Sequence, residues 1–223
     1  HDLSIGPKFA LLEEYALVAR ALSAPARLML LEQLAQGERG VEALADKTSL
    51  TIANCSQHLQ QLRRAALVTS RRDGKAVIYR LTDAKTLALM DLLRIVAERN
   101  LAQVERILRG LSSGEDAPEP VSREVLAVRI AEGSVTVLDV RPADEYAAGH
   151  IPGALNMTLT EIERIVPSLD PAVEIVAYCR GPYCIYAHQA VAALRKHGLN
   201  ARRLDGGLPE WREDGLPVLA GAQ

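Results

Sequence analysis

The sequence is poor in cysteine and in aromatic residues, and it has no long apolar run. Its 223 residues include 3 Cys, 1 Phe and 1 Trp, and aromatic side chains make up 4%. Three cysteines are too few for a disulfide framework, so we expect a reducing, cytoplasmic compartment in which thiols serve chemistry or packing. Apolar runs such as 173–178 are far shorter than the roughly 20 residues that a membrane span needs, so we expect no transmembrane helix and no membrane partner.

Length and composition favour a globular protein with two modest domains. Apolar residues make up 48% of the chain and charged residues 24%, which is enough apolar side chain for ordinary cores. The chain begins at His1 without an initiator Met and without the basic-then-apolar profile of a secretory signal, so we expect that its start is truncated.

The two halves of the chain differ in charge. Residues 1–111 carry 16 Lys and Arg against 12 Asp and Glu, whereas residues 112–223 carry 10 against 16. Between them, residues 112–120 contain two prolines, turn-forming residues and almost no apolar side chain, which is typical of a linker. We therefore predict domains over 1–111 and 121–223, and we expect only the basic first domain to meet a polyanion.

The first half has the pattern of a winged helix. A first helix is predicted by the helical spacing of Leu11, Tyr15, Val18 and Leu22. Apolar spacing and capping residues predict further helices over 24–35, 41–46, 52–65 and 83–111. Asp73-Gly74 predicts a hairpin between strands 67–72 and 75–81, because both positions of such a turn favour positive φ. A helix-turn-helix followed by a basic hairpin is the layout of a winged-helix DNA-binding domain.

Side-chain spacing separates a core face from a DNA face on helix 52–65. Cys55, Leu59, Leu62 and Ala66 form an apolar stripe, so we interpret Cys55 as a buried packing residue rather than a ligand or sensor thiol. Polar and basic side chains of the other face and of the hairpin offer donors for base edges and phosphates. These candidate DNA-binding residues are Ser56, Gln57, His58, Gln60, Gln61, Arg63, Arg64, Arg71, Arg72 and Lys75.

Two segments, Ala24-Pro25-Ala26-Arg27-Leu28 and residues 56–68, resemble the ArsR/SmtB family of bacterial repressors. The resemblance implies a homodimer, formed through the first and last helices, that binds double-stranded operator DNA with helix 52–65 in the major groove. An apolar stripe on the last helix agrees with self-association: Met90, Leu93, Ala97, Leu101, Val104 and Leu108. Residues 40–44 lack the paired cysteines of the family's arsenic and cadmium sensors, and 83–111 lacks His and Cys, so we expect no metal and no cofactor.

The second half alternates strand and helix patterns. Val135–Val140 and Val173–Tyr178 read as buried strands and Ala187–His197 as a helix, which predicts an α/β domain with a small parallel sheet. The second strand leads into a loop with a helix expected to begin near its end, at about residue 184. Backbone N–H groups and the positive end of the helix dipole would favour a thiolate there, and we expect Arg180 to add positive charge. The loop residues are Cys179, Arg180, Gly181, Pro182, Tyr183 and Cys184.

Three motifs around this loop resemble the rhodanese family. They are residues 139–146, residues 149–156 and residues 204–211 followed by 215–218. The resemblance implies a sulfurtransferase fold in which Cys179 is the nucleophile that accepts sulfur. It also implies a supporting polar cluster of Asp139, Arg141 and Glu145.

Other residues limit the chemistry of the loop without settling it. Ile185 occupies the position where related phosphatase loops carry an Arg, which disfavours phosphate ester hydrolysis. Cys184 either attacks a persulfide or sulfenate on Cys179 to form a disulfide, or only packs at the helix start, and the sequence does not decide between these roles. We interpret His150 as a turn or supporting residue rather than a catalytic base.

Together these features predict a transcriptional regulator, a repressor in its family's usual pattern, whose rhodanese half captures reactive sulfane sulfur or a related thiol oxidant on Cys179. Two alternatives stay open. One is a sulfurtransferase enzyme that moves sulfur from a small donor to a thiol acceptor through a Cys179 persulfide, with the winged helix serving dimerisation or targeting. The other is a regulator that responds to arsenic or another thiophilic species at Cys179 and Cys184.

Overall fold

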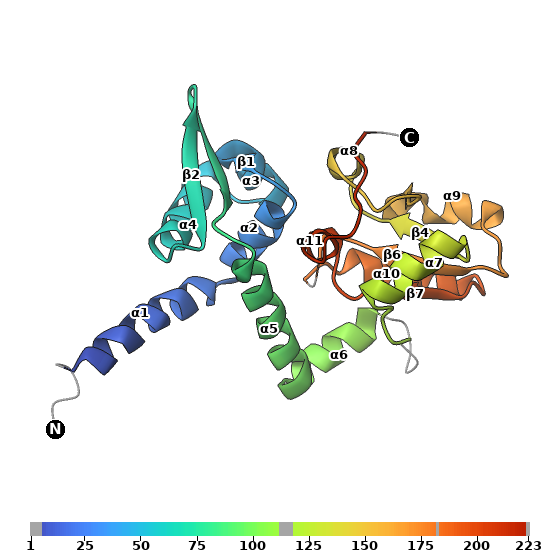
Figure 1. Ribbon diagram of the computed structural model, residues 1–223, viewed down its shortest axis with the longest axis horizontal. Helices are drawn as coiled ribbons and strands as arrows, with labels where there is room; N and C mark the ends of the chain where they lie inside the picture. Colours follow the sequence, from blue (N-terminus) through green and yellow to red (C-terminus); the bar gives the residue numbers. More distant parts are fainter. Residues whose placement is uncertain (1–5, 112–117, 182, 222–223) are drawn as a thin grey trace. The chain divides into compact units, whose positions relative to one another are not determined.

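The computed structural model describes residues 6–111, 118–181 and 183–221. The chain divides into two compact units, His1–Met90 and Asp91–Gln223, which are described separately (Figure 1). The division falls inside a helix, and most of the expected linker at 112–120 lies outside the described residues. The domain boundaries expected at 111 and 121 therefore stay a prediction.

Helices and a small antiparallel sheet build the first unit. Within the described residues the sheet has the strand order β1-β3-β2, and β2 and β3 form the hairpin that we call the wing. The elements are α1 (Pro7–Leu22), α2 (Pro25–Ala35), β1 (Arg39–Gly40), α3 (Val41–Thr48), α4 (Ile52–Arg64), β2 (Val68–Asp73) and β3 (Ala76–Leu81). This is the order that the sequence predicts, with one further short strand, β1.

The turn of the wing lies one residue later than predicted. Asp73 pairs with Ala76, so the two loop residues are Gly74 and Lys75 instead of Asp73 and Gly74. Gly74 has φ +59°, and neither Asp73 nor Lys75 has a positive φ among the described residues. A hairpin turn of this kind needs a positive φ at its first loop position, which glycine adopts most easily. The turn therefore takes the register that puts Gly74 at that position.

The core stripe of α4 is confirmed except at its end. Cys55, Leu59 and Leu62 are fully buried, and burial raises the pKa of the Cys55 thiol. Ala66 is exposed and has φ +56°, and Ala65 is buried in its place. The prediction was wrong at Ala66 because the helix ends at Arg64, after which the helical periodicity no longer applies.

The long helix predicted over 83–111 is two helices, α5 (Lys85–Asn100) and α6 (Ala102–Leu111), with a break at Leu101. At the break, the Asn100 side chain donates a hydrogen bond of 2.8 Å to the Val96 carbonyl. Side chains that compete for a backbone carbonyl in this way favour helix ends. The predicted apolar stripe is divided too: Leu93 and Leu101 are exposed, whereas Met90 is buried.

The second unit is a parallel sheet with helices on both faces. Among the described residues, the strand order is β5-β4-β6-β7 and each neighbouring pair is parallel. After α6, the elements are α7 (Arg123–Glu132), β4 (Val135–Asp139), α8 (Ala143–Ala148), β5 (Leu155–Asn156), α9 (Ile162–Ile165), β6 (Glu174–Tyr178), α10 (Tyr186–Lys196), β7 (Ala201–Arg203) and α11 (Leu208–Glu213). Of the helices that the structure describes, none has the length and apolar character of a membrane span.

Alternating side chains of the strands build a core on each face of this sheet. In β6, Ile175 and Ala177 pack with residues of α9 and α10, while Val176 and Tyr178 pack with residues of α7 and α11. This period of two is what a strand buried on both faces requires. β6 is an inner strand, between β4 and β7. The cysteine loop begins at its carboxyl end.

Candidate functional site

The cysteine loop joins the end of β6 to the start of α10. Cys179 follows Tyr178 directly, and α10 begins at Tyr186, two residues later than the sequence predicts. Cys179 is 1% exposed and Cys184 is 8% exposed. Gly181 has φ +142°, a conformation that favours glycine, and the Cys184 N–H donates to its carbonyl at 3.1 Å. The predicted loop residue Pro182 lies outside the described residues.

Cys179 and Cys184 form a disulfide, with Cα atoms 6.2 Å apart. The sequence left the role of Cys184 open between a bonding partner and a packing residue, and the structure shows it as a bonding partner. In this state neither sulfur is a nucleophile. A two-electron reduction of the disulfide frees the Cys179 thiol for chemistry and makes Cys184 the thiol positioned to close the bond again. The loop therefore holds two cysteines close enough to bond to each other.

Arg180 does not act as a free positive charge beside Cys179. Its guanidinium makes bonds of 2.9–3.1 Å to both carboxylate oxygens of Glu145, which is 2% exposed. The expectation that Arg180 adds positive charge at the thiol is corrected, because the Glu145 carboxylate neutralises it at close range. The pair instead fixes the first turn of the loop to α8.

A second buried cluster holds the end of β4 against the end of β6. The Asp139 carboxylate accepts bonds from the Arg141 Nε at 2.9 Å, from Arg141 Nη2 at 2.5 Å and from the Tyr178 hydroxyl at 2.5 Å. Asn156 donates to the carbonyl oxygens of Asp139 and Arg141. Burial, and then the neighbouring Asp139 charge, raise the pKa of Tyr178. The structure thus brings Asp139 and Arg141 together, and Glu145, which is bonded to Arg180, is close enough for its charge to act on Arg141.

The sequence did not indicate that Gly207 and Glu210 pack against the cysteine loop. A Cβ added at Gly207 would lie 2.6 Å from the Cys179 carbonyl oxygen and 2.6 Å from Gly181 Cα, so only glycine allows this approach of two backbones. Glu210 lies beside Gly181 and accepts a bond of 2.8 Å from the Gly207 N–H. Burial raises the pKa of the Glu210 carboxyl. The doubled glycine at 206–207 was the available signal for this contact.

His150 lies in a structural position. It is 1% exposed, its ring stacks on Tyr146 with centroids 3.8 Å apart, and its Nδ1 lies 3.0 Å from the Tyr146 carbonyl. Its backbone N–H donates to Leu219, which joins the turn to the end of the chain. These contacts fit the supporting role that the sequence indicates.

The other predicted surface is the outward face of α4. Thr51 caps the helix by accepting the Asn54 N–H at 3.2 Å. Gln57, Arg63 and Arg64 are exposed, and Ser56, His58 and Gln60 are half-buried. Gln61 faces inward instead, because its carboxamide oxygen accepts a bond of 2.6 Å from Arg27.

Arg27 ties α4 to the end of α1. The same guanidinium donates to the carbonyls of Ala21 at 2.5 Å and Arg20 at 2.7 Å, which are among the last carbonyls of α1. The Arg20 carbonyl also accepts bonds from the N–H and hydroxyl of Ser23, so the contribution of Arg27 matters most at the Ala21 carbonyl. We therefore leave Gln61 out of the surface considered for DNA below.

The basic side chains of the wing are exposed. Arg71 forms exposed ion pairs with Glu38 at 2.9 Å and Asp73 at 3.1 Å. Arg72 and Lys75 are exposed as well. Exposed pairs of this kind contribute about 0 to 1 kcal/mol, so they do not prevent Arg71 from contacting another anion.

Comparison with known proteins identifies both halves. A model of the rhodanese-like domain matches residues 122–214, and a model of a helix-turn-helix domain matches residues 22–71. The biofilm growth-associated repressor of Agrobacterium fabrum is 41% identical over 80 residues, which cover 36% of this chain and 68% of that protein. The homodimeric winged helix-turn-helix domain Mb0332 of Mycobacterium bovis, a solved structure, is 40% identical, covers 43% of this chain and 88% of that chain, and has a TM-score of 0.40.

One relative resembles the chain along nearly its whole length. The HTH-type transcriptional regulator Rv0324 of Mycobacterium tuberculosis is 44% identical over 216 residues, which cover 96% of this chain and 94% of that protein. The predicted fold class, a winged helix-turn-helix followed by a rhodanese-like α/β domain, is confirmed. The chain therefore belongs to the ArsR/SmtB family of helix-turn-helix transcriptional regulators, among those that carry a rhodanese-like domain.

Proposed function

We propose that this regulator is a homodimeric repressor whose affinity for operator DNA is set by the oxidation state of its cysteine loop, with reactive sulfane sulfur or a related thiol oxidant as the signal. The observation that carries the proposal is the Cys179–Cys184 disulfide, which lies in a rhodanese-like domain of a chain that belongs to a family of transcriptional regulators. We propose repression, not activation, because the Agrobacterium relative is a repressor.

The chemistry uses Cys179 as the nucleophile and Cys184 as the resolving thiol. The reduced Cys179 thiolate attacks a terminal sulfane sulfur of a polysulfide, and a polysulfide shorter by one sulfur leaves, so that a persulfide forms on Cys179. The Cys184 thiolate then attacks the Cys179 sulfur and releases the outer sulfur as hydrosulfide. The two protein thiols have lost two electrons, and the sulfane sulfur has gained them.

The proposed DNA contacts divide into base reading and backbone binding. On α4, exposed Gln57 and half-buried Gln60 present carboxamides, which suit base edges in the major groove. The arginines of α4 and the basic side chains of the wing suit phosphates. The full proposed set is Ser56, Gln57, His58, Gln60, Arg63, Arg64, Arg71, Arg72 and Lys75.

Self-association is proposed through apolar faces that the described residues leave uncovered. α1 exposes Phe9, Leu11, Leu12 and Tyr15, with Tyr15 65% exposed. Four large apolar side chains are thus exposed within two turns of one helix, and monomeric proteins rarely leave large apolar patches in water. α5 exposes Leu92, Leu93 and Val96.

The test is DNA binding at fixed salt, because phosphate contacts make affinity strongly salt-dependent. The reduced full-length protein is titrated against its own upstream DNA before and after treatment with inorganic polysulfide. We expect polysulfide to lower the affinity of wild type and of Cys55→Ala, in which the third and fully buried cysteine is removed. We expect no response from Cys179→Ser.

Two outcomes would contradict the proposal. If Cys179→Ser responds to polysulfide as wild type does, the signal does not act through the loop. If wild type turns over polysulfide and a thiol acceptor rapidly while its DNA affinity stays constant, the sulfurtransferase alternative replaces the sensor.

A further inference from the structure

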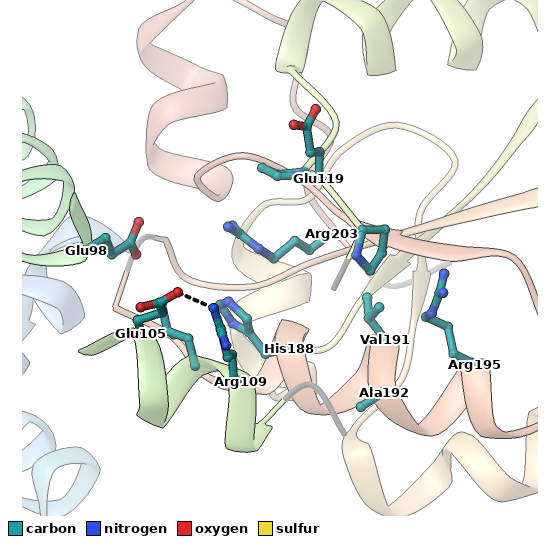
Figure 2. A pocket seen from close by; sticks show the side chains of 12 residues that line it. Glu98, Glu105, Arg109, Glu119, His188, Val191, Ala192, Arg195 and Arg203 are labelled. Carbon is teal, nitrogen blue, oxygen red and sulfur yellow. Dashed lines mark hydrogen bonds and ion pairs between the residues drawn. The ribbon is translucent and has the colours of Figure 1, made fainter. Parts of the chain in front are cut away.

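The second unit contains a cavity between α6 and α10, which lies outside the disulfide itself. Its volume is about 310 Å³, which is the size of a small-molecule site. Its walls combine apolar side chains with a few charged ones (Figure 2). Leu108 of α6 and Val191 and Ala192 of α10 are part of the apolar wall.

Arg203, at the end of β7, is the unusual group in this cavity. Figure 2 shows its guanidinium pointing into the cavity beside His188. The side chain is half-buried, and within the part of the chain that the structure describes it forms no hydrogen bond or ion pair. Burial lowers the pKa of this guanidinium, against the influence of Asp205 and Glu98. A desolvated cation with free donors is stabilised by a bound anion, most of all by one that accepts two hydrogen bonds.

The other charged groups at the cavity differ from Arg203. Arg109 is bonded to Glu105, as the dashed line in Figure 2 marks. Glu98 is paired with Arg94 at 2.8 Å. Burial, and then the nearby Arg203, lower the pKa of His188 to about 4, so His188 is neutral at physiological pH and does not compete for an anion. Arg195, the remaining cation of the lining, is exposed to solvent, which solvates its charge. Arg203 is therefore the half-buried cation to which an anionic ligand would bind.

A second cavity of about 260 Å³ connects this feature to the disulfide. It shares Glu98, Leu108 and His188 with the first cavity, and its lining includes Cys184. His188 thus separates the Arg203 side from the Cys184 side. Ala97, Val104 and Ile185 contribute to a mostly apolar wall. Cys184 is also the more exposed of the two bonded cysteines, 8% against 1% for Cys179.

We propose that these adjoining cavities bind a small organic thiol that carries a carboxylate, and that this thiol reduces the loop disulfide by attacking Cys184. The carboxylate binds the Arg203 guanidinium, the carbon chain contacts the apolar wall, and the thiolate faces the Cys184 sulfur. The inference rests on the proposed function, because it supplies the step that returns the oxidised loop to its reduced state.

The reaction proceeds in two exchanges. The ligand thiolate attacks Cys184, a new sulfur–sulfur bond forms there, and Cys179 leaves as a thiolate. A second thiol, also as its thiolate, attacks the ligand sulfur of this mixed disulfide, and Cys184 leaves as a thiolate. Two small thiols are oxidised to one small disulfide, the protein disulfide is reduced by two electrons, and the two protons given up by the small thiols return to the protein thiolates.

The experiment compares a carboxylate thiol with a neutral one. Full-length protein is oxidised to the disulfide form, and the rate of disulfide opening is measured with 3-mercaptopropionate and with 2-mercaptoethanol. The ratio of the two rates is then compared between wild type and Arg203→Gln, so that the intrinsic reactivities of the two thiols cancel. We expect the ratio to fall about tenfold in Arg203→Gln, equivalent to about 1.4 kcal/mol of binding to the charged group.

Two further variants test whether the change in the ratio comes from anion binding at Arg203, from the net charge of the protein or from misfolding. Lys196→Gln removes one exposed positive charge from the end of α10, the helix that lines both cavities, at a residue that lines neither, and it should keep the wild-type ratio. Arg203→Lys retains the charge and should keep a ratio between those of wild type and Arg203→Gln. An unchanged ratio in Arg203→Gln, or an equal fall in Lys196→Gln, would overturn the site.

The position of attack is measured directly. The reaction is quenched in acid, free thiols are alkylated, and the protein is cleaved after Arg180, which places Cys179 and Cys184 on different peptides. We expect the small thiol on Cys184 and the alkyl group on Cys179, and the reverse pattern would contradict the proposal. These thiol assays contain no DNA, so they test the thiol site separately from the proposed function. If the loop opens with this selectivity but the DNA affinity, measured in the separate titration, is the same before and after opening, the proposed function is overturned and the thiol site is not.

Discussion

The buried pair of Asp139 and Arg141 gives the sharpest test of what holds the cysteine loop in place. Both side chains are at most 1% exposed, and Asp139 Oδ2 accepts from both Arg141 Nη2 and the Tyr178 hydroxyl. In Asp139→Asn the shape is conserved, but one oxygen becomes an NH₂ group that faces donors. The buried Arg141 guanidinium then loses the carboxylate to which it is bonded.

Breaking a buried ion pair by removing one partner costs about 3 to 5 kcal/mol. A domain of ordinary stability has about 5 to 15 kcal/mol of unfolding free energy, so we expect Asp139→Asn to lose a large part of it. Trp211 is the sole tryptophan of the chain and is 1% exposed in the second unit, so its fluorescence reports on unfolding of this unit. The measurement is a urea titration of Trp211 fluorescence, with linear extrapolation to water.

The matched control is Arg164→Gln, which removes an ion pair with Glu161 whose two side chains are 81% and 44% exposed. Such exposed pairs contribute little, so we expect a change below about 0.5 kcal/mol. Since Tyr178 directly precedes Cys179, the reduced Asp139→Asn variant should also alkylate faster at Cys179. A loss of less than about 1 kcal/mol in Asp139→Asn would refute the reasoning.

Three further predictions concern other contacts. Gly207→Ala should destabilise the second unit by about 2 to 3 kcal/mol, because the added Cβ would clash with the Cys179 carbonyl. Gly198→Ala, where the Cβ meets no other atom but φ is +78°, should cost about 1 to 2 kcal/mol. Equal losses of stability in thermal melts followed by Trp fluorescence would contradict this. Arg27→Met should cost about 1 to 3 kcal/mol, because it removes the Arg27 donor from the Ala21 carbonyl and from the Gln61 carboxamide. Circular dichroism melts that match wild type would contradict it. The folded protein favours neutral His188, because the pKa of His188 in the folded state, about 4, lies below its unfolded value. The free energy of unfolding should therefore fall by about 1 to 2 kcal/mol as the pH falls from about 6.5 to 4. Urea titrations at each pH should show a smaller decrease in His188→Gln.

Features that depend on local periodicity could be predicted from the sequence. The stripe of Cys55, Leu59 and Leu62 is buried because a helix repeats every 3.6 residues, and α4 is continuous through these positions. The apolar run before Cys179 forms a strand buried on both faces, which places the loop at the edge of the sheet. Periodicity is reliable where an element continues, and it fails where the element ends.

Predictions were wrong where a single residue decides the end of an element. Ala66 turns outward because its φ is positive, and α5 ends where the Asn100 side chain bonds to Val96. The wing turn shifts by one residue because Gly74 alone supplies the positive φ. In each case the preference of one side chain differs by about 1 kcal/mol or less between neighbouring registers, which is too little to recognise from the sequence.

Partners that are far apart in the sequence form the least predictable part of the site. Glu145 is 35 positions before Arg180, and nothing in the sequence near either residue indicates that they pair. The cavity at Arg203 is assembled from α6, α10 and β7, and no pattern within any of them marks the free guanidinium. Such contacts follow from the fold as a whole, so local propensities carry no signal for them.

The two ends of the cysteine loop differ in how they are held, and in the proposed switch this difference makes the Cys184 end the part that moves when the loop is oxidised or reduced. The Cys179 end follows a central strand and packs against the Gly207 backbone, so it has little room to move. The Cys184 end lines a cavity shared with α6, which follows α5 after one residue. A change of 5- to 150-fold in DNA affinity requires a coupling free energy of about 1 to 3 kcal/mol. One or two side-chain contacts are of that size, so rearranging the contacts between the Cys184 end and α6 supplies enough free energy for the proposed switch.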